Sequence, residues 1–138
     1  DTKFLLTQNI HLQMLELGHY ERIISQASKV LIVGCRDLRT KFENKFGVEA
    51  SFVKIPGEAK FVEDERSHYP DAYEAIKEDI RQNIAPLVLV GAGLPGNVYC
   101  NVAKEVGAVS IDIGSVMDIW AGENTRTNFG KYQKYVLK

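Results

Sequence analysis

The sequence is poor in the features that mark disulfide-rich, zinc-binding or membrane-spanning proteins. It has two cysteines, Cys35 and Cys100, and no C-x-x-C pair. Two isolated thiols give neither a disulfide framework nor the spacing of a zinc site, so we expect both to be reduced, in a cytoplasmic protein. No apolar run approaches the roughly 20 residues that cross a bilayer. The first residues, Asp1, Thr2 and Lys3, lead into a short, interrupted apolar stretch, which does not predict a signal peptide.

Charge of one sign is not in excess either. The chain has 17 Lys and Arg against 18 Asp and Glu, a net charge of -1. Binding to nucleic acid is therefore not expected, because it depends on a strong basic excess. With 138 residues, 45% of them apolar and 25% charged, the chain suits one globular domain. Because it begins at Asp1 without methionine, we expect it to be part of a longer protein.

The pattern along the chain predicts three segments. Residues 1–29 are predicted to be helical, residues 30–122 to form a Rossmann-like α/β domain, and residues 123–138 to form a polar tail. Short apolar runs of the kind found in fully buried strands predict strands at 30–34, 51–55, 87–90 and 109–113. Helical periodicity between them predicts helices at about 38–46, 70–84 and 98–106. From Gly114 onward we expect a polar loop that continues into the tail, with Trp120 as its one large apolar residue.

Strands and helices alternate twice, at 30–55 and again at 87–113. This alternation predicts a Rossmann-like three-layer α/β fold with a mostly parallel four-stranded sheet in the order 2-1-3-4, preceded by the N-terminal helices. In that order the topology switches between the first and third strands. Ligands of open α/β sheets bind outside the carboxyl ends of the strands at such a switch.

A glycine motif follows the third predicted strand. Gly91, Gly93 and Gly96 match G-x-G-x-x-G between a strand and a helix, and Asp112 comes 21 residues after Gly91. Such glycines let the backbone approach a phosphate at the helix N-terminus, and a later carboxylate holds a ribose. The alternative is a tight turn with no ligand. An ordinary NAD site is disfavoured, because only one strand and then a polar loop follow the motif.

The loop after the first strand supplies three more candidate binding residues, Gly34, Arg36 and Asp37. Arg36 suits a bidentate contact to a phosphate, and a solvated arginine is the alternative. Asp37 stands where it either binds a ligand or caps the following helix. Ser115 lies between Asp112 and Asp118, and these carboxylates suit a sugar hydroxyl or a metal.

Other residues carry weaker signals. Arg126 is a candidate anion contact, with a flexible tail as the alternative, and His68 and Glu58 show no pairing of nucleophile and base. We expect His11 and His19 to lie at the surface or an interface. No catalytic residue is predicted.

Five short motifs lie between Lys29 and Gly122: V30-L-I-V-G34, I55-P-G-E-A59, the helix near Tyr73–Ile80, L87-V-L-V-G-A-G93 and S110-I-D-I-G-S115. In these motifs the stretch from Lys29 to Gly122 resembles the C-terminal half of GT-D-type bacterial glycosyltransferase domains. That family similarly pairs a strand that ends in a small-residue turn with a later strand that ends in Asp-Ile-Gly.

This resemblance implies a Rossmann-like sheet, a nucleotide-sugar donor and a role in bacterial glycan synthesis, with Asp112 as a site residue. The family carries an acidic metal-binding motif, Gly-Asp-Gly-Glu, in its N-terminal half, and residues 1–60 contain no match to it. A divalent metal would then need residues outside this chain. Either the chain is the C-terminal part of a longer enzyme, or it is a degenerate domain.

Three functions stay open at this point. The chain is a glycosyltransferase-like domain that binds a nucleotide sugar, an NAD(P)-binding domain of an oxidoreductase, or a non-catalytic α/β accessory module. The expected partner is a small nucleotide ligand, and assembly into an oligomer is left open.

Overall fold

The computed structural model describes residues 9–57, 67–125 and 128–138 of the chain. Four strands form one sheet, β1 (Lys29–Gly34), β2 (Glu49–Lys54), β3 (Leu87–Gly91) and β4 (Val109–Asp112). The helices are α1 (Ile10–Glu16), α2 (His19–Ser25), α3 (Arg39–Phe46), α4 (Tyr73–Gln82), α5 (Gly96–Glu105), α6 (Val116–Ala121) and α7 (Phe129–Tyr132), with a π-helical turn η1 (His68–Ala72) and a 3₁₀ turn η2 (Gln133–Tyr135).

The sheet is parallel throughout, in the order β2-β1-β3-β4. The predicted α/β fold and strand order are thus confirmed. β1 pairs with β2 on one side and with β3 on the other, so that Gly34 lies opposite both Lys54 and Gly91. The chain therefore leaves β1 in one direction and β3 in the other. This is the topological switch that the alternation predicts.

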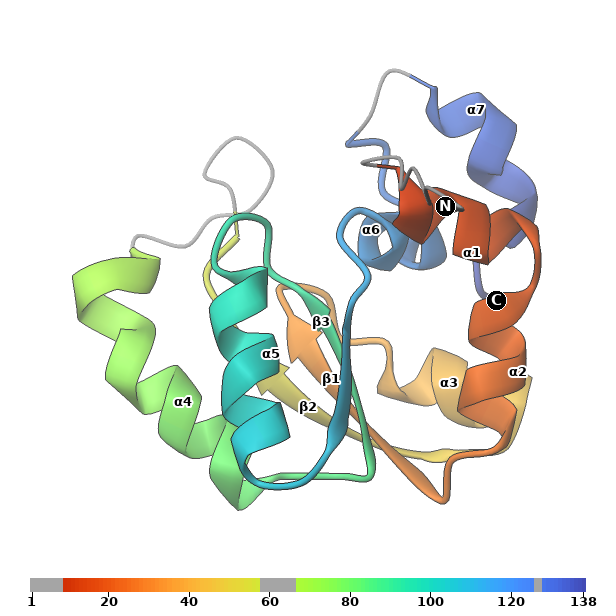
Figure 1. Cartoon of the computed structure of the whole chain (residues 1–138). Coiled ribbons are helices and arrows are strands. Elements are labelled where there is room, and N and C mark those ends of the chain that lie inside the picture. The colour runs from red at the N-terminus through yellow and green to blue at the C-terminus, as the bar shows by residue number, and fades with distance from the viewer. Residues whose placement is uncertain (1–8, 58–66, 126–127) are drawn as a thin grey trace, which may run out of the picture.

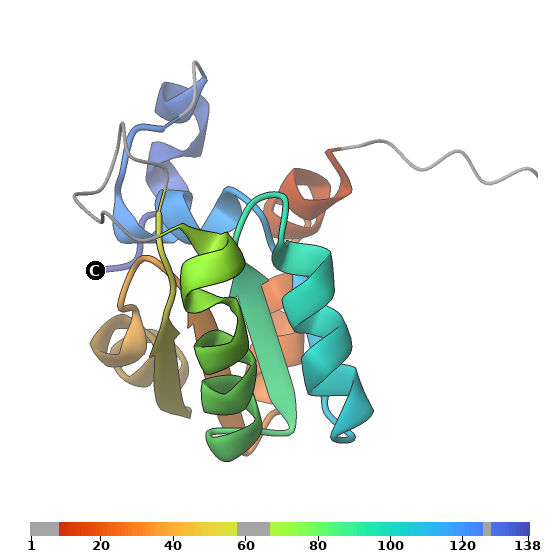
Figure 2. The ribbon, with the colours of Figure 1, turned by 90° about the vertical axis from the view of Figure 1, so that its left-hand side faces the viewer.

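Helices cover both faces of the sheet, which gives three layers (Figure 1). Helices α4 and α5 lie side by side on one face (Figure 2), and α2, α3 and α6 lie on the other. Successive side chains of β1 point to opposite faces of the sheet. Val30 and Ile32 pack in one apolar cluster, and Leu31 and Val33 pack in the other. Because both faces are covered, the strand is apolar at every position from Val30 to Val33.

Helix α6 corrects the expectation of a polar loop after Gly114. Its residues Val116, Met117, Ile119 and Trp120 are all buried, so Trp120 is not the one large apolar residue of this region. Trp120 packs edge-to-face against both Tyr20 and Phe42, in helices α2 and α3.

The last residues also pack against the domain. Leu137 is buried in the same cluster as Trp120, and its backbone N–H donates to the Trp120 carbonyl over 3.0 Å. The Lys41 ammonium donates to the carbonyl of Leu137. Residues 128–138, within the segment expected to be a polar tail, therefore contact the domain through Leu137. At the other end of the chain, α1 and α2 confirm the helical prediction for the described part of 1–29.

Other predicted boundaries differ from the observed ones by a few residues. The second strand begins at Glu49 and ends at Lys54, and the helix predicted from Pro70 begins at Tyr73. Both cysteines are free thiols, as expected. No helix in the described ranges is long and apolar enough to cross a membrane.

Candidate functional site

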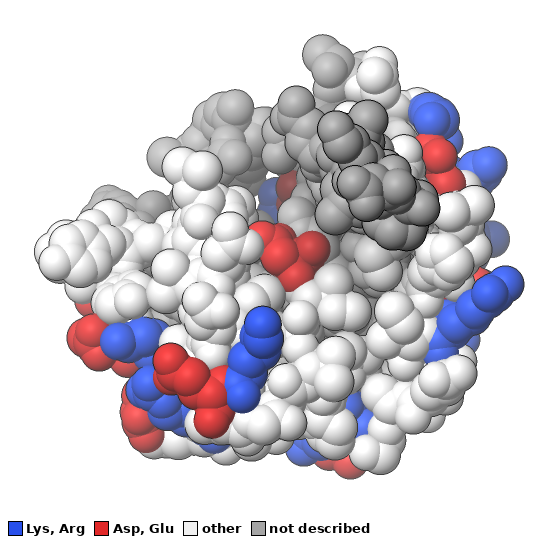
Figure 3. Space-filling model, in the orientation of Figure 1, with Lys and Arg blue, Asp and Glu red and all other residues white. Residues whose placement is uncertain are grey.

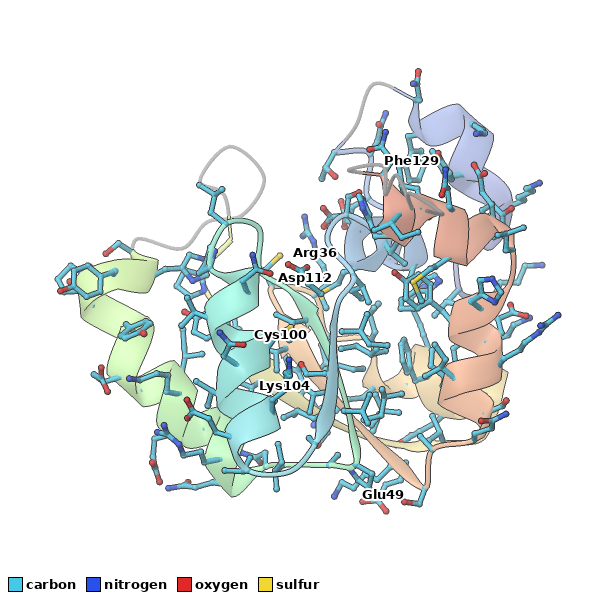
Figure 4. All side chains as sticks on the ribbon, viewed as in Figure 1. Arg36, Glu49, Cys100, Lys104, Asp112 and Phe129 are labelled. Carbon is cyan, nitrogen blue, oxygen red and sulfur yellow. The ribbon has the colours of Figure 1, made fainter. Side chains whose placement is uncertain are left out.

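A crevice of about 400 Å³ lies at the carboxyl ends of the strands, where the topology switches. That volume falls in the lower part of the range for small-molecule sites. Figure 4 shows Arg36, which follows β1, and Asp112, which ends β4, at this end of the sheet. The lining residues come from the segments after all four strands: Cys35, Arg36, Pro56, Gly57, His68, Gly91, Ala92, Gly93, Leu94, Pro95, Gly114, Ser115, Met117 and Asp118.

The three glycines of the motif serve three different purposes. A β-carbon on Gly91 would meet the Met117 Cβ at 2.9 Å, and one on Gly96 would meet the Asp112 Oδ2 at 2.5 Å. These two glycines therefore allow close packing inside the protein. Gly93 has a φ of +62° and open space around it. It alone of the three combines a conformation that favours glycine with room for a ligand.

Gly34 is a packing glycine as well. The sulfur and terminal methyl of Met117 fill the place where its β-carbon would stand. Met117, which is 2% exposed, thus lies across the ends of β1 and β3 and forms part of the crevice floor. The side chain of Met117 covers Gly34. The structure therefore does not bring Gly34 to the crevice, where its contact with a ligand was predicted.

Arg36 lies in the crevice, and its charge is offset by acidic neighbours. Its Nε donates to the Asp118 Oδ1 over 3.4 Å, and its Nη1 lies 3.8 Å from the Glu123 Oε1. Thr125 donates to the other oxygen of Asp118 over 2.9 Å. Only 16% of the Arg36 side chain and 23% of the Asp118 side chain are exposed, so this pair is a fixed part of the wall.

Asp37 is engaged with its own loop. Its carboxylate accepts the Arg39 backbone N–H over 3.1 Å and three hydrogen bonds from the Arg39 guanidinium, of 3.0, 3.1 and 2.7 Å. The hydrogen bond from the Arg39 side chain lowers the pKa of Asp37. Asp37 is not among the residues that line the crevice in the described part of the chain. It precedes α3 as the capping alternative predicts, although Leu38 stands at the cap position.

Asp112 stands beside the crevice. Its Oδ1 accepts the Gly114 backbone N–H over 2.9 Å, and its other oxygen lies against Gly96 at the start of α5. Figure 3 shows acidic side chains near the middle of this face, and Figure 4, in the same orientation, labels Asp112 in that region. Asp112 therefore holds the β4–α6 turn against α5, next to the position expected for a ribose-binding carboxylate.

Ser115 contacts a histidine that no sequence motif selects as a site residue. Its hydroxyl lies 3.3 Å from the His11 Nε2, in helix α1, across 104 residues of sequence. The His11 ring packs on Gly114, where a β-carbon would come within 3.4 Å of it. Ser115 is 8% exposed and lines the crevice. His11 was expected at the surface or an interface, and its half-buried ring lies against the loop that carries Ser115.

His68 also lies at the crevice. Its Nδ1 is 3.1 Å from the hydroxyl of Tyr99, which is fully buried in α5. Burial raises the pKa of Tyr99, with Tyr73 adding to the effect, so Tyr99 keeps its proton at neutral pH. Burial likewise raises the pKa of the Cys35 thiol, against a smaller lowering by Arg36. Cys35 is thus a protonated thiol at neutral pH and not the thiolate that acts as a nucleophile.

The described residues contain no group of three or more His, Cys, Asp and Glu side chains that could hold a metal ion. The two carboxylates considered for a metal have other partners, since Asp118 binds Arg36 and Thr125, and Asp112 binds Gly114. The described part of the chain therefore does not fit a metal centre of its own. The candidate residues Glu58 and Arg126 lie outside the described ranges.

The fold and the crevice define an open, parallel α/β domain with a ligand-sized cavity at its switch point. Comparison with models of protein families, with curated proteins and with solved structures finds no match to this chain. The indications of function are therefore the geometry of the crevice and the motifs in the sequence.

Proposed function

We propose that the crevice binds the nucleotide of a nucleotide-sugar donor, and that the chain is the donor-binding α/β domain of a glycosyltransferase-like protein. The observation that carries this proposal is the open loop around Gly93, which leads from β3 into α5 beside the topological switch. The resemblance of the sequence motifs to GT-D-type domains supports the same class.

The loop suits a phosphate for two reasons. Helix α5 has ten residues, and the dipole of a helix favours an anion near its N-terminus, although the Asp112 carboxylate already lies against Gly96 and the Gly96 N–H donates to the Gly93 carbonyl. Gly93 has no side chain to keep an anion away from the backbone, and its surroundings are open. Arg36 offers little net positive charge to a phosphate, because the carboxylates of Asp118 and Glu123 offset the charge of its guanidinium. Backbone N–H groups of the loop are therefore the main phosphate donors in this proposal.

An NAD(P)-binding domain is the second candidate, and Asp112 is the observation that favours it. This carboxylate ends β4, the strand next to the glycine motif, as in a dinucleotide fold. However, it already accepts the Gly114 N–H and does not line the crevice in the described part of the chain. A nucleotide sugar needs no ribose contact at that place, which is why it is the first candidate.

Isothermal titration calorimetry separates the candidates. The intact chain is titrated with UDP, GDP and ADP, with UDP-glucose, GDP-mannose and ADP-glucose, and with NAD and NADP, first with EDTA and then with Mg²⁺. Binding of a nucleotide sugar supports the proposal. Binding of NAD or NADP alone supports the oxidoreductase domain. No heat with any of them overturns the proposal and leaves the accessory module.

A further inference from the structure

The two ends of the crevice differ in chemistry. One end is formed by the loop Gly93–Pro95, by Pro56 and Gly57 and by His68, in segments that lead to α5 and α4 on one face of the sheet, and it offers backbone, apolar surface and an imidazole ring. The other end, here called the polar end, is formed by Arg36, Ser115 and Asp118, in segments that lead to or form α3 and α6 on the other face. A ligand that fills the crevice must therefore have one part that suits each end.

The charge at the polar end disfavours phosphate. Arg36 contacts both Asp118 and Glu123, so one cation faces two carboxylates. An added phosphate would be repelled by this excess of negative charge, since like charges within a few ångströms of each other are unfavourable. A neutral group that donates hydrogen bonds would bind favourably there, because a carboxylate is a strong acceptor.

Asp118 still has capacity to accept. Its two oxygens offer about four lone-pair sites, and Arg36 Nε and Thr125 Oγ1 each occupy one. The same two contacts hold the carboxylate in place, so little side-chain entropy is lost when a ligand binds. A fixed, partly buried carboxylate of this kind suits adjacent hydroxyl groups.

Ser115 adds a hydroxyl of fixed position. It is 8% exposed, and the His11 Nε2 lies 3.3 Å from its Oγ. A serine hydroxyl both donates and accepts, so it can bind a sugar hydroxyl in either sense. His11 does not line the crevice in the described part of the chain, and it acts on the site by positioning Ser115.

We infer that the polar end binds the hydroxyl groups of the sugar, while the Gly93 loop holds the nucleotide phosphates. This inference rests on the proposed function and deepens it, because it gives the donor an orientation. Asp118 and Ser115 then determine the preference for a sugar-bearing nucleotide over the bare nucleoside diphosphate.

The experiment compares each nucleotide sugar with its own diphosphate, UDP-glucose with UDP and GDP-mannose with GDP, by calorimetry. The parent chain is expected to bind the sugar-bearing member about tenfold more tightly. Asp118→Asn is expected to remove most of this preference and to leave the affinity for the diphosphate unchanged. A hydrogen bond to a charged group contributes enough for such a change. Ser115→Ala, the second variant, is expected to lower the preference about threefold.

Asp37→Asn is the matched control, because Asp37 is also bound to an arginine but lies away from the crevice lining. It should keep the full preference. Equal affinity of the parent for both members of each pair would overturn the inference, as would equal weakening of both by Asp118→Asn in a folded protein. Binding of no nucleotide by the parent is a different result, because it overturns the proposed function itself. Thermal unfolding of each variant verifies folding, and Ser115→Ala decides the outcome if Asp118→Asn does not fold.

Discussion

The side chain of Met117 occupies the space in which a β-carbon on Gly34 would stand. The two residues are far apart in the sequence, and they meet where β1 ends under helix α6. Met117 also limits Gly91, at the end of β3, to a glycine. A single buried side chain therefore explains two glycines that a ligand would otherwise be invoked to explain.

Gly34→Ala is expected to destabilise the protein by about 1–3 kcal/mol, the usual cost of overpacking a core. Met117→Ala alone should cost about 2–5 kcal/mol through the cavity that it leaves. The double variant should be clearly more stable than the sum of the two costs predicts, because the added methyl group then enters that cavity. Urea denaturation of the four proteins measures this coupling.

The coupling is the decisive quantity in that experiment. Costs that add within about 0.5 kcal/mol would show that the two side chains do not compete for one space. Met117→Ala with Ser51→Ala is a suitable comparison pair, because Ser51 lies in β2, away from helix α6.

Gly93→Ala is expected to fold and to lose nucleotide affinity at least tenfold. Its φ of +62° is unfavourable for alanine, at a cost of about 1–2 kcal/mol, but there is space for the methyl group. The loss of affinity would come from the methyl group at the place where the backbone approaches phosphate. Calorimetry with the nucleotide that the parent binds measures the effect.

Gly47→Ala is the matched control. Gly47 has a φ of +64° and open space, and it ends α3. Both variants should lose similar stability, and only Gly93→Ala should lose affinity. If folded Gly93→Ala bound the nucleotide as tightly as the parent, the glycine loop would be a structural turn only.

The pair of Asp37 and Arg39 predicts a small dependence of stability on pH. Because Arg39 lowers the pKa of Asp37 in the folded chain, the carboxylate stabilises the folded state above its unfolded pKa of about 3.9. That contribution is lost as the pH falls through the lower, folded pKa. Asp37→Asn should therefore reduce stability slightly near neutral pH and not at all in strong acid. Denaturation from about pH 7 down to about pH 2 tests this, and a difference that grows on acidification would contradict it.

The fold could be predicted because the two central strands, β1 and β3, are buried on both faces. Runs such as Val30–Val33 and Leu87–Val90 must be apolar at every position, and the helical segments between them leave few topologies. Helix α6 was missed because it has only six residues and follows the polar loop that ends in Ser115. Short helices depend on tertiary packing more than on local pattern.

The site could be predicted only in outline. The topological switch predicted where the crevice lies. It also predicted that Arg36 and the Gly93 loop line it. The contact of His11 with Ser115 spans 104 residues, and no local pattern reports it. The glycine pattern is ambiguous for a different reason: Gly91 and Gly96 are required by neighbours inside the protein, and a ligand would impose the same requirement.

The C-terminal segment provides the last prediction. Leu137 is 5% exposed and packs in the cluster that contains Trp120, so Leu137→Ala should destabilise the protein by about 2–5 kcal/mol. Lys134→Ala is the control, because Lys134 is exposed in η2 of the same segment, and it should change stability by less than about 0.5 kcal/mol. Urea denaturation followed by Trp120 fluorescence reports on this cluster directly. If Leu137→Ala were as stable as Lys134→Ala, the segment would not contribute to the core, and the prediction of a separate polar tail from residue 123 would stand.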